Sequence, residues 1–560
     1  MTSAPSGVSG PFSGPLFQAA LLFAFTASIH LVLLGDAPLA GTEGHRALTA
    51  HQMAQGGSWV IPELYGRPYV RKPPLHYWVL AGVERLTGRA DEWIWRLPSV
   101  LAAGLLAATI GLFSRRWFGP LAGWVGGLGF AGLVALWAQS RTADIDSLNT
   151  FAATLGALAV IELALGRTTS RAGWALLAGL ALGATLLLKG PQGLSIIAGA
   201  GVWAFVWGVR KRVWRIGRLP WLVAAVWLGF ALFGAWAFLA YVQAQQRQIP
   251  ADTSGIEEGL ANLYPDSAGR LLRALAVPPT LALFGLPVTA VLPLAWLPQV
   301  RRGMAPYRRR ILTGLVGSVL VAWGLCVASG MVNERYAYVT LPLLCPAAGA
   351  VAARLTRFPL ASTGPLRLAI ALVALAYCIA AIVLAAPLAR NADPLAIATL
   401  VAVVAVMALY DRLSRTWRAS LLIPLAMLLV AYPFAQDHNR RRAQRSGKAA
   451  AAIVREAVPP GAHVVVGAML RFQPELFHYA GVNARAYRED IPAPHELRGD
   501  VWLILNAREL KLYRDQVPAR LKHLTPFESN KTRCFVVWYE SVRPTTDQAS
   551  PSTAEARLAN

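Results

Sequence analysis

Cysteine is scarce in this chain, and the few thiols form no recognisable pattern. Only 4 cysteines occur among 560 residues. Cys326, Cys345 and Cys378 lie in apolar runs, and Cys534 lies in the C-terminal region. No two of them have the C-x-x-C spacing of a metal or redox site. The sequence therefore predicts neither an intramolecular disulfide framework nor a cysteine metal site.

Charged residues are also scarce. They make up 15% of the chain, whereas soluble domains contain roughly 25%. Hydrophobic residues reach 55%, and the 19 tryptophans suit the aromatic belts at membrane interfaces. This composition predicts an integral membrane protein.

No Lys or Arg precedes the first apolar run, Pro15–Leu34. A cleaved signal peptide has a basic start and a shorter apolar core. This run is about 20 residues long, which is enough to cross a bilayer. We therefore expect a retained transmembrane helix, preceded by a disordered stretch at residues 1–14.

Further apolar runs follow, separated by short polar loops and one long loop at residues 36–96. They lie at residues 97–114, 119–137, 147–165, 173–188, 191–208, 219–242, 279–297, 311–329, 336–353, 367–388, 395–410 and 419–435. Together with the first run they predict an α-helical membrane domain of about 13 transmembrane helices over residues 15–436. No internal repeat is visible.

The net charge of +24 would suit a nucleic-acid partner, but the positions of the basic residues indicate another cause. Twenty of them fall in alternate loops: Arg115, Arg116, Arg167, Arg171, Arg210, Lys211, Arg212, Arg215, Arg218, Arg301, Arg302, Arg308, Arg309, Arg310, Arg354, Arg357, Arg367, Arg412, Arg415 and Arg418. The positive-inside rule places these loops in the cytoplasm, where they meet anionic lipid. The 36–96 loop and the C-terminal region are then extracytoplasmic, and no nucleic acid is expected.

Residues 437–543 differ from the apolar part of the chain. Buried strands are predicted at residues 462–469, 500–506 and 534–540, with helices at 444–456 and 474–480. We expect a small extracytoplasmic α/β domain, followed by a disordered tail at residues 544–560. Because this region lacks a Gly-rich phosphate loop, a nucleotide-binding role is not predicted.

The stretch from Gly41 to Trp78 has the most specific sequence signal. It contains an acidic residue followed by His and Arg, then Ala, Met, Gly-x-Trp-Val-x-Pro, Tyr, Lys-Pro-Pro and Tyr-Trp. A flexible linker would contain few aromatic residues, so we expect an ordered segment that rests on the membrane. This order of residues resembles the first external loop of membrane glycosyltransferases of the aminoarabinose-transferase and protein O-mannosyltransferase type.

The resemblance implies a GT-C fold in the inner membrane and an active site on the extracytoplasmic face. It implies transfer of a sugar from a polyprenyl-phosphate donor to lipid A, another envelope glycan or lipid, or a protein. The alternative is a polyprenyl-lipid transporter or flippase, which would show charges deep within helices and broken helices in paired halves. The sugar and the acceptor stay open.

In the related family the general base belongs to an Asp-Glu pair at the start of this loop. Here the pair reads Thr42-Glu43, which leaves Glu43 as the catalytic candidate. The alternative is an ion pair of Glu43 with Arg46 or His45. The resemblance also makes His45 and Arg46 candidates for substrate binding.

The same resemblance assigns the lipid-linked phosphate to Lys72, which two prolines hold in place. The alternative is an anchor to lipid headgroups. A Glu that can bind a metal often precedes this Lys, but Arg71 stands there, and the 243–278 loop lacks the His that sometimes completes that site. A divalent metal stays open, although its usual ligands are absent and no metal ligand is assigned.

Other outer loops supply the remaining candidates. Asp144 and Asp146 enter a membrane helix, where unpaired charge is costly, and the family has an Asp here. They are catalytic candidates, and the alternative is a helix N-cap, which Asp146 fits better than Asp144. The substrate-binding candidates are Arg141, Lys189, Arg335 and Tyr336. Lys189 alternatively serves as an interfacial cation.

Overall fold

The computed structural model describes most of the chain. It covers residues 14–540 apart from 66, 71, 191–193, 211–215, 249–267, 287, 290–292, 331–334, 336, 356–364, 414–421, 461, 463, 468–472, 483, 487–496, 498–499 and 530–531. The predicted disordered ends, residues 1–14 and 544–560, lie outside this set except for Gly14. The chain forms two compact units. One comprises residues up to Pro38 and Thr49–Arg442, and the other comprises Leu39–Leu48 and the chain from Ala443 on.

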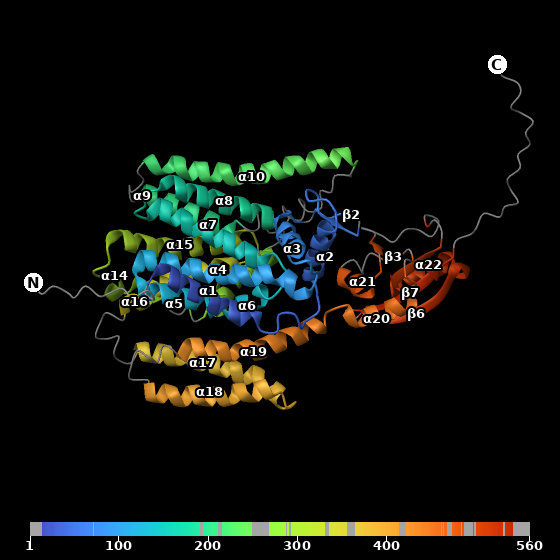
Figure 1. The fold of residues 1–560 in the computed structure, drawn as a ribbon. Coiled ribbons are helices and arrows are strands. Elements are labelled where there is room, and N and C mark those ends of the chain that lie inside the picture. Colours follow the sequence, from blue (N-terminus) through green and yellow to red (C-terminus); the bar gives the residue numbers. More distant parts are fainter. Residues whose placement is uncertain are drawn as a thin grey trace, which may run out of the picture. The chain divides into compact units, whose positions relative to one another are not determined.

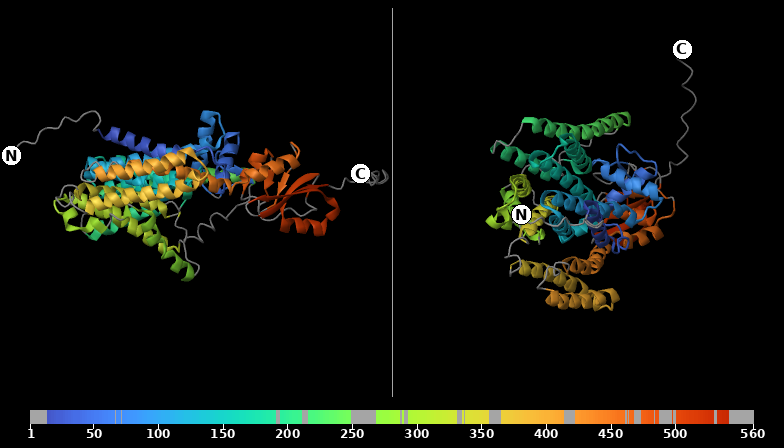
Figure 2. Two further views of the ribbon diagram at one scale, coloured as in Figure 1. Left: turned by 90° about the horizontal axis from the view of Figure 1, so that it is seen from below. Right: turned by 60° about the vertical axis from the view of Figure 1, so that its left-hand side comes forward.

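Helices that lie side by side, most of them apolar, make up most of the first unit (Figures 1 and 2). They are α1 (Pro15–Leu31), α4 (Glu92–Phe118), α5 (Pro120–Ala131), α6 (Val134–Ser140), α7 (Asp146–Leu165), α8 (Arg171–Lys189), α9 (Ser195–Arg210), α10 (Leu219–Gln246), α12 (Ala268–Ala274), α13 (Val277–Phe284), α14 (Pro298–Arg301), α15 (Pro306–Ala328), α16 (Cys345–Leu355), α17 (Pro365–Ala389), α18 (Pro394–Leu413) and α19 (Leu422–Ala443). The 3-10 helices η3 (Ile216–Arg218), η5 (Pro293–Trp296) and η7 (Tyr338–Leu344) connect some of them. Several helices begin with Pro, whose missing N–H costs nothing in the first turn.

In the described residues, 7 helices are long and apolar enough to cross a membrane, or 8 if the bent pair α5–α6 is one span. The multi-span helical architecture is therefore confirmed, whereas the number thirteen stays a prediction. The predicted span at residues 279–297 is wrong as a continuous helix. Helix α13 ends at Phe284, and the next described helical element is η5. Gly285 and the prolines of this run explain the interruption, because Pro lacks the N–H that a helix interior needs.

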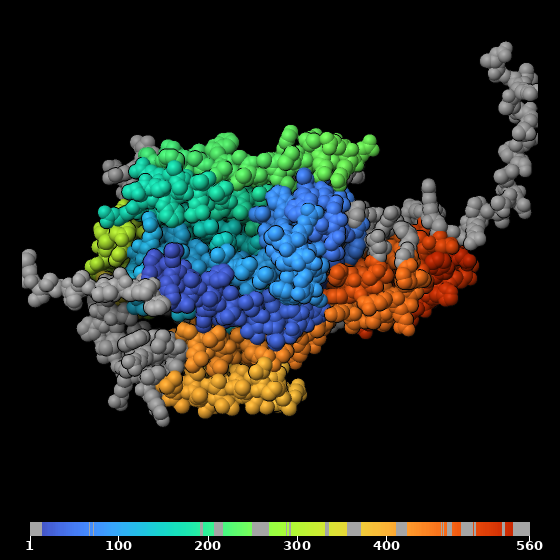
Figure 3. Space-filling model, in the orientation of Figure 1, coloured from blue at the N-terminus to red at the C-terminus, as the bar shows by residue number. Residues whose placement is uncertain are grey.

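The centre of the first unit contains α4, which contacts α1, α5 and α7. By contrast, α10 exposes most of its surface, including Trp227 (70%) and Phe238 (66%). The α10 surface forms one edge of the space-filling view (Figure 3). It packs on α8 where glycine permits close approach, since a Cβ at Gly229 would lie 2.6 Å from Leu182 Cγ. An apolar face of this size fits a lipid environment.

The bend between α5 and α6 brings the chain to the functional region. The helices differ in direction by 65°. Two carbonyl groups at the break accept side-chain hydrogen bonds, one from Tyr377 Oη to Gly132 (2.6 Å) and one from Trp137 Nε1 to Ala131 (2.8 Å). Because buried backbone carbonyls need partners, these bonds stabilise the break. Helix α6 then ends at Ser140, immediately before the segment that contains Asp144.

The long first loop is ordered in its described residues, as predicted. It forms α2 (Thr42–Ala54), the strand pair β1 (Glu63–Leu64) and β2 (Arg67–Pro68), and α3 (Leu75–Thr87). Within the first unit, the Glu84 carboxylate of α3 accepts from Trp95 Nε1 (2.9 Å) and pairs with His51 Nδ1 (2.7 Å). These contacts join α3 to the end of α2 and the start of α4.

The second unit contains a five-stranded sheet in the order β4 (Ala484–Ala486), β3 (Val464–Val466), β5 (Val501–Asn506), β7 (Thr532–Tyr539), β6 (Leu521–Ser529). The first three strands are parallel, and β7 pairs antiparallel with β5 and β6. Helices α20 (Lys448–Ala457), α21 (Pro474–Ala480) and α22 (Ala507–Gln516) accompany the sheet. The three predicted strands are observed as β3, β5 and β7, and the two predicted helices as α20 and α21.

Candidate active site

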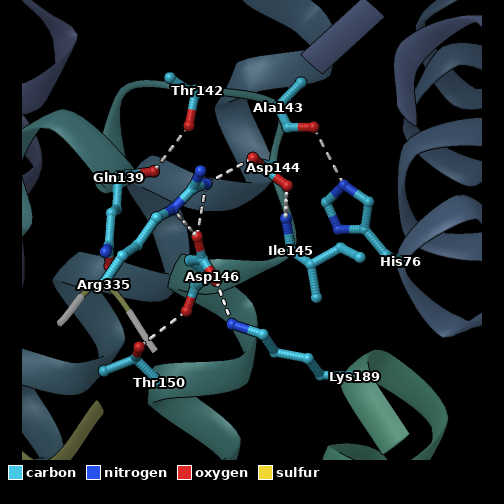
Figure 4. Close-up of polar contacts among 10 residues, drawn as sticks. All are labelled: His76, Gln139, Thr142, Ala143, Asp144, Ile145, Asp146, Thr150, Lys189 and Arg335. Atoms are coloured by element: carbon cyan, nitrogen blue, oxygen red, sulfur yellow. Dashed lines mark hydrogen bonds and ion pairs between the residues drawn. The ribbon is translucent and has the colours of Figure 1, made fainter. Parts of the chain in front are cut away.

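A short buried segment between α6 and α7 forms the base of the site (Figure 4). His76, at the start of α3, donates from Nε2 to the Ala143 carbonyl oxygen (3.1 Å). Thr142 Oγ1 donates to the Gln139 carbonyl (3.1 Å), and Ser147 Oγ donates to Ser99 of α4 (2.8 Å). Contacts from α3, α4 and α6 thus fix the backbone on both sides of Asp144.

Four charged side chains meet at this segment. Asp146 accepts from Lys189 Nζ at Oδ1 (2.5 Å) and from Arg335 Nε at Oδ2 (2.6 Å). Asp144 accepts from a guanidinium nitrogen of Arg335 (2.6 Å) and from the backbone N–H of Ile145 (2.9 Å). We call Asp144, Asp146, Lys189 and Arg335 the charge cluster. Residues that are far apart in the sequence are therefore brought together.

The helix geometry favours the ion pair at the centre of the cluster. Asp146 is the first residue of α7, and Lys189 is the last residue of α8. The partial positive charge at a helix N-terminus stabilises an anion, and the C-terminus stabilises a cation. Both side chains are nearly inaccessible, at 8% for Asp146 and 7% for Lys189. The pair therefore lies in a poorly solvated place. Removal of one partner would leave the other charge buried and unpaired, which would lower the stability of the fold.

Arg335 differs from the other members because 41% of its side chain is exposed. Burial lowers the pKa of its guanidinium, but the charges and hydrogen bonds of Asp146 and Asp144 raise it more, so the net pKa is above the usual value. Arg335 therefore stays protonated. The cluster contains two negative and two positive charges, and its cationic part reaches solvent through Arg335.

The capping alternative for Asp146 is wrong. The N-cap of α7 is Ile145, and no side chain forms a capping bond there. The Asp146 carboxylate instead uses both oxygens for the two cations. The first helical turn still stabilises the negative charge of Asp146, but its carboxylate oxygens accept hydrogen bonds from Lys189 and Arg335.

Arg141 points to a different partner. It is buried, and its guanidinium donates to the carbonyls of His30 (2.8 Å) and Leu33 (3.4 Å) at the end of α1. Burial and the nearby Arg96 lower the pKa of Arg141 to about 10, although Asp36 opposes this effect. The side chain therefore stays charged near neutral pH, and it joins α1 to the segment before Asp144.

The first-loop candidates Glu43, His45 and Arg46 belong to the second unit. Glu43 is buried at 1% exposure and Arg46 at 7%, whereas His45 is half-buried. Lys72 is half-buried in the first unit. Tyr336, which was predicted to bind substrate, lies outside the described residues, and so does Arg71.

Sequence reasoning assigned no role to His76 or Gln139. His76 follows the two prolines of the Lys72 element, yet only the fold shows that it holds the Ala143 carbonyl. Gln139 is buried at 8% exposure next to the charge cluster. Within the described residues, no group of three His, Cys, Asp or Glu side chains is placed to hold a metal ion. The expectation about a divalent metal therefore stays a prediction.

Residues 71–237 match the family described as dolichyl-phosphate-mannose-protein mannosyltransferase. The chain is 34% identical over 152 residues to the undecaprenyl phosphate-alpha-4-amino-4-deoxy-L-arabinose arabinosyl transferase of Pseudomonas paraeruginosa. It is 30% identical over 151 residues to the corresponding transferase 2 of Pseudomonas fluorescens. Each alignment covers 26% of this chain and 27% of the relative.

The solved structures extend the likeness over the whole fold. The crystal structure of ArnT from Cupriavidus metallidurans bound to undecaprenyl phosphate matches with a TM-score of 0.71 and 19% identity. The match covers 97% of this chain and 100% of that chain. The apo state of the same protein gives a TM-score of 0.68 at 18% identity.

The predicted family resemblance is confirmed. Residues 71–237 of this chain, which match the family, include three members of the charge cluster, Asp144, Asp146 and Lys189. The structural match also covers nearly the whole chain, the second unit included, and it shows that the fold is that of ArnT.

Proposed function

We propose that this chain is an inner-membrane glycosyltransferase that moves a sugar from a polyprenyl-phosphate donor to an extracytoplasmic acceptor. The observation that carries the proposal is the charge cluster. It brings Lys189 and Arg335 to the adjoining ends of α7 and α8, and Asp144, Asp146 and Lys189 lie within the residues that match the family. The names of the relatives suggest undecaprenyl phosphate-alpha-4-amino-4-deoxy-L-arabinose as the donor. The acceptor is lipid A, another envelope glycan or lipid, or a protein hydroxyl.

The reaction needs a base and a set of cations. The acceptor hydroxyl oxygen attacks the anomeric carbon of the sugar, and the bond from that carbon to the phosphate oxygen breaks. The electron pair leaves with the polyprenyl phosphate. Cations stabilise the negative charge of this leaving group. A base takes the hydroxyl proton. We assign the phosphate to Lys72, Lys189 and Arg335, the cations that the family resemblance indicates. The exposed part of the Arg335 guanidinium offers charge-assisted hydrogen bonds.

The contacts of Asp144 and Asp146 make them poor bases. Both oxygens of Asp146 accept from cations, and both oxygens of Asp144 accept hydrogen bonds. Each carboxylate oxygen that would take the proton is therefore already engaged by a donor. We therefore assign these two residues to orientation of Arg335 and Lys189, and the base role to Glu43.

The proposed activity is tested with the purified protein, the aminoarabinose-linked undecaprenyl phosphate and vesicles that contain lipid A. We expect release of free undecaprenyl phosphate that depends on the acceptor, together with a glycosylated acceptor. A transporter would instead move the intact donor between leaflets without releasing the phosphate. No donor cleavage with any acceptor class, together with movement of intact donor in proteoliposomes, would overturn the proposal. Neither the family match nor the structural match supports that alternative.

The proposed topology has thirteen spans, with the N-terminus in the cytoplasm and the active site and C-terminal unit outside. It rests on the basic residues of alternate loops. Reporter fusions after Arg218 and after His438 should report from opposite sides, the first cytoplasmic and the second extracytoplasmic. Signals from the same side would contradict the topology.

Lys72→Ala is expected to weaken binding of undecaprenyl phosphate by about ten- to a hundredfold, since a charge-assisted contact is worth about 1.5–3 kcal/mol. Binding of undecaprenyl phosphate to purified protein measures the effect. Arg85→Ala is the matched control, because Arg85 lies in the same loop with its guanidinium over Trp59 (5.1 Å) and its Nε bonded to the Ala54 carbonyl (3.0 Å). Equal affinity of the Lys72→Ala and Arg85→Ala variants would return Lys72 to the role of a headgroup anchor.

A further inference from the structure

The start of the first loop and the C-terminal chain form one compact unit. Leu39–Leu48, which contains Glu43, groups with the residues from Ala443 on. Within this unit, the Leu39 backbone N–H donates to Tyr479 Oη (2.7 Å) at the end of α21. More than four hundred residues of sequence separate these two partners. The stretch that carries the proposed base is therefore structurally part of the C-terminal unit.

Glu475 makes a second contact between the two segments. It lies in the first turn of α21 and is fully buried, at 0% exposure. A Cβ added to Gly44 would lie 2.4 Å from Glu475 Oε2 and 3.3 Å from Glu475 Cβ. The Glu475 carboxylate thus rests against the backbone of Gly44, and any larger residue at position 44 would displace it.

The place of this contact on α2 gives it a physical meaning. Gly44 is the third residue of α2, so it lies in the first turn, next to Glu43. The free N–H groups of a first turn give it a partial positive charge, and a polar side chain before the helix often complements this charge. The residue before α2 is Gly41, which has a φ of +63° and no side chain for this purpose. An anion beside this turn also interacts favourably with the helix dipole.

We propose that Glu475 is a positioning residue for the transfer reaction. Its carboxylate, supplied by the C-terminal unit, lies against the first turn of α2 at Gly44 and so holds the adjacent Glu43 in its working orientation. It places a second carboxylate at the α2 start, where the loop has Thr42 instead of the acid of the related pair. This inference rests on the proposed function, because its consequence for turnover acts through Glu43.

The test compares Glu475→Gln and Glu475→Ala with a matched control, Glu509→Ala. Glu509 is a buried glutamate of the same unit whose carboxylate accepts from the Asn506 N–H (2.8 Å) in the capping box of α22. We expect both Glu475 variants to lower kcat by about ten- to a hundredfold with unchanged KM for the donor, since small misplacements of reacting groups have effects of this size. Glu509→Ala should lower the melting temperature of the unit and leave kcat unchanged below it.

A double-substitution experiment tests the contact itself. Alanine favours a helix over glycine, so Gly44→Ala alone should not disturb α2, yet its methyl group would displace the Glu475 carboxylate. We expect Gly44→Ala to lower kcat in the parent protein and to add little in the Glu475→Ala background, where the space is open. Fully additive effects would show that the two positions act independently and would overturn the inference.

Hydrogen exchange provides a readout that does not require activity. Backbone amides of residues 39–48 should exchange faster in Glu475→Ala than in the parent protein, and at the parent rate in Glu509→Ala. If the parent protein transfers no sugar, the proposed function fails, while faster exchange would still support the contact between Glu475 and the first turn of α2. If the parent is active and Glu475→Ala keeps kcat within twofold with unchanged exchange, the inference alone fails.

Discussion

Glu43→Gln is expected to lower turnover by about a hundredfold or more, while the binding of undecaprenyl phosphate stays unchanged. The substitution keeps the shape of the side chain and removes the group that would take the proton from the acceptor hydroxyl. Glu43 lies in the first turn of α2 and is buried at 1% exposure. Release of undecaprenyl phosphate at saturating donor measures the chemical step, and a direct binding assay measures the donor separately.

Asp144→Asn is the matched comparison for this prediction. It also replaces a carboxylate with an amide, but that carboxylate already accepts from Arg335 and from the Ile145 N–H. We expect a smaller effect on turnover and a measurable effect on binding, because Arg335 loses part of its support. A second comparison is Thr42→Asp in the Glu43→Gln background, which restores an acid to the neighbouring position and should recover part of the lost rate.

Two outcomes would contradict the assignment of Glu43. If Glu43→Gln retains near-normal turnover and Asp144→Asn is slow, the base role passes to Asp144. If neither substitution slows donor cleavage, the acceptor arrives already ionised or the protein uses other chemistry. Either result leaves the fold and the charge cluster unaffected.

The architecture was predictable wherever a residue pattern is local. The apolar runs predicted the long helices, because a run of about twenty consecutive apolar residues is typical of a transmembrane helix. Buried β3, β5 and β7 were predicted from short runs of branched and aromatic residues. The strand β6 (LKHLTPFES) and the charged helix α22 lack such runs, so tertiary context decides their structure. The interruption after Phe284 was missed because hydropathy does not register the effect of Gly285 and neighbouring prolines.

The candidate site was predictable in membership but not in arrangement. Asp144 and Asp146 were selected from one loop, because charge that enters a membrane helix is costly unless it is paired or used. Lys189 and Arg335 were selected as cations of two other outer loops. Their mutual pairing depends on how α7 and α8 pack, and no local pattern encodes it. The same is true of His76, whose role is visible only where its ring reaches the Ala143 carbonyl. Nor does a local pattern predict that Leu39–Leu48 groups with the C-terminal chain, since these two segments are the farthest apart in the sequence.

Asp146→Ala is expected to have the largest effect on stability, a loss of ~3–5 kcal/mol in the free energy of unfolding. The substitution leaves the Lys189 ammonium, with 7% of its side chain exposed, without its carboxylate. Asp144→Ala should cost about 1 kcal/mol or less, because its partner Arg335 is 41% exposed and keeps Asp146. Unfolding of the two purified variants in detergent measures this difference, and equal losses would show that the buried pair has no special weight.

The double substitution Asp146→Asn with Lys189→Met separates stability from binding. It removes both buried charges together, and replacing a buried ion pair by uncharged residues is often nearly neutral for stability. Arg335 retains Asp144 in this variant. We expect a free energy of unfolding close to that of the parent protein, but binding of undecaprenyl phosphate weaker by about ten- to a hundredfold, because Lys189 no longer contacts the phosphate. A stable double variant with parental affinity would show that Lys189 and Asp146 serve the helix packing alone, and the phosphate would then depend on Lys72 and the exposed guanidinium of Arg335.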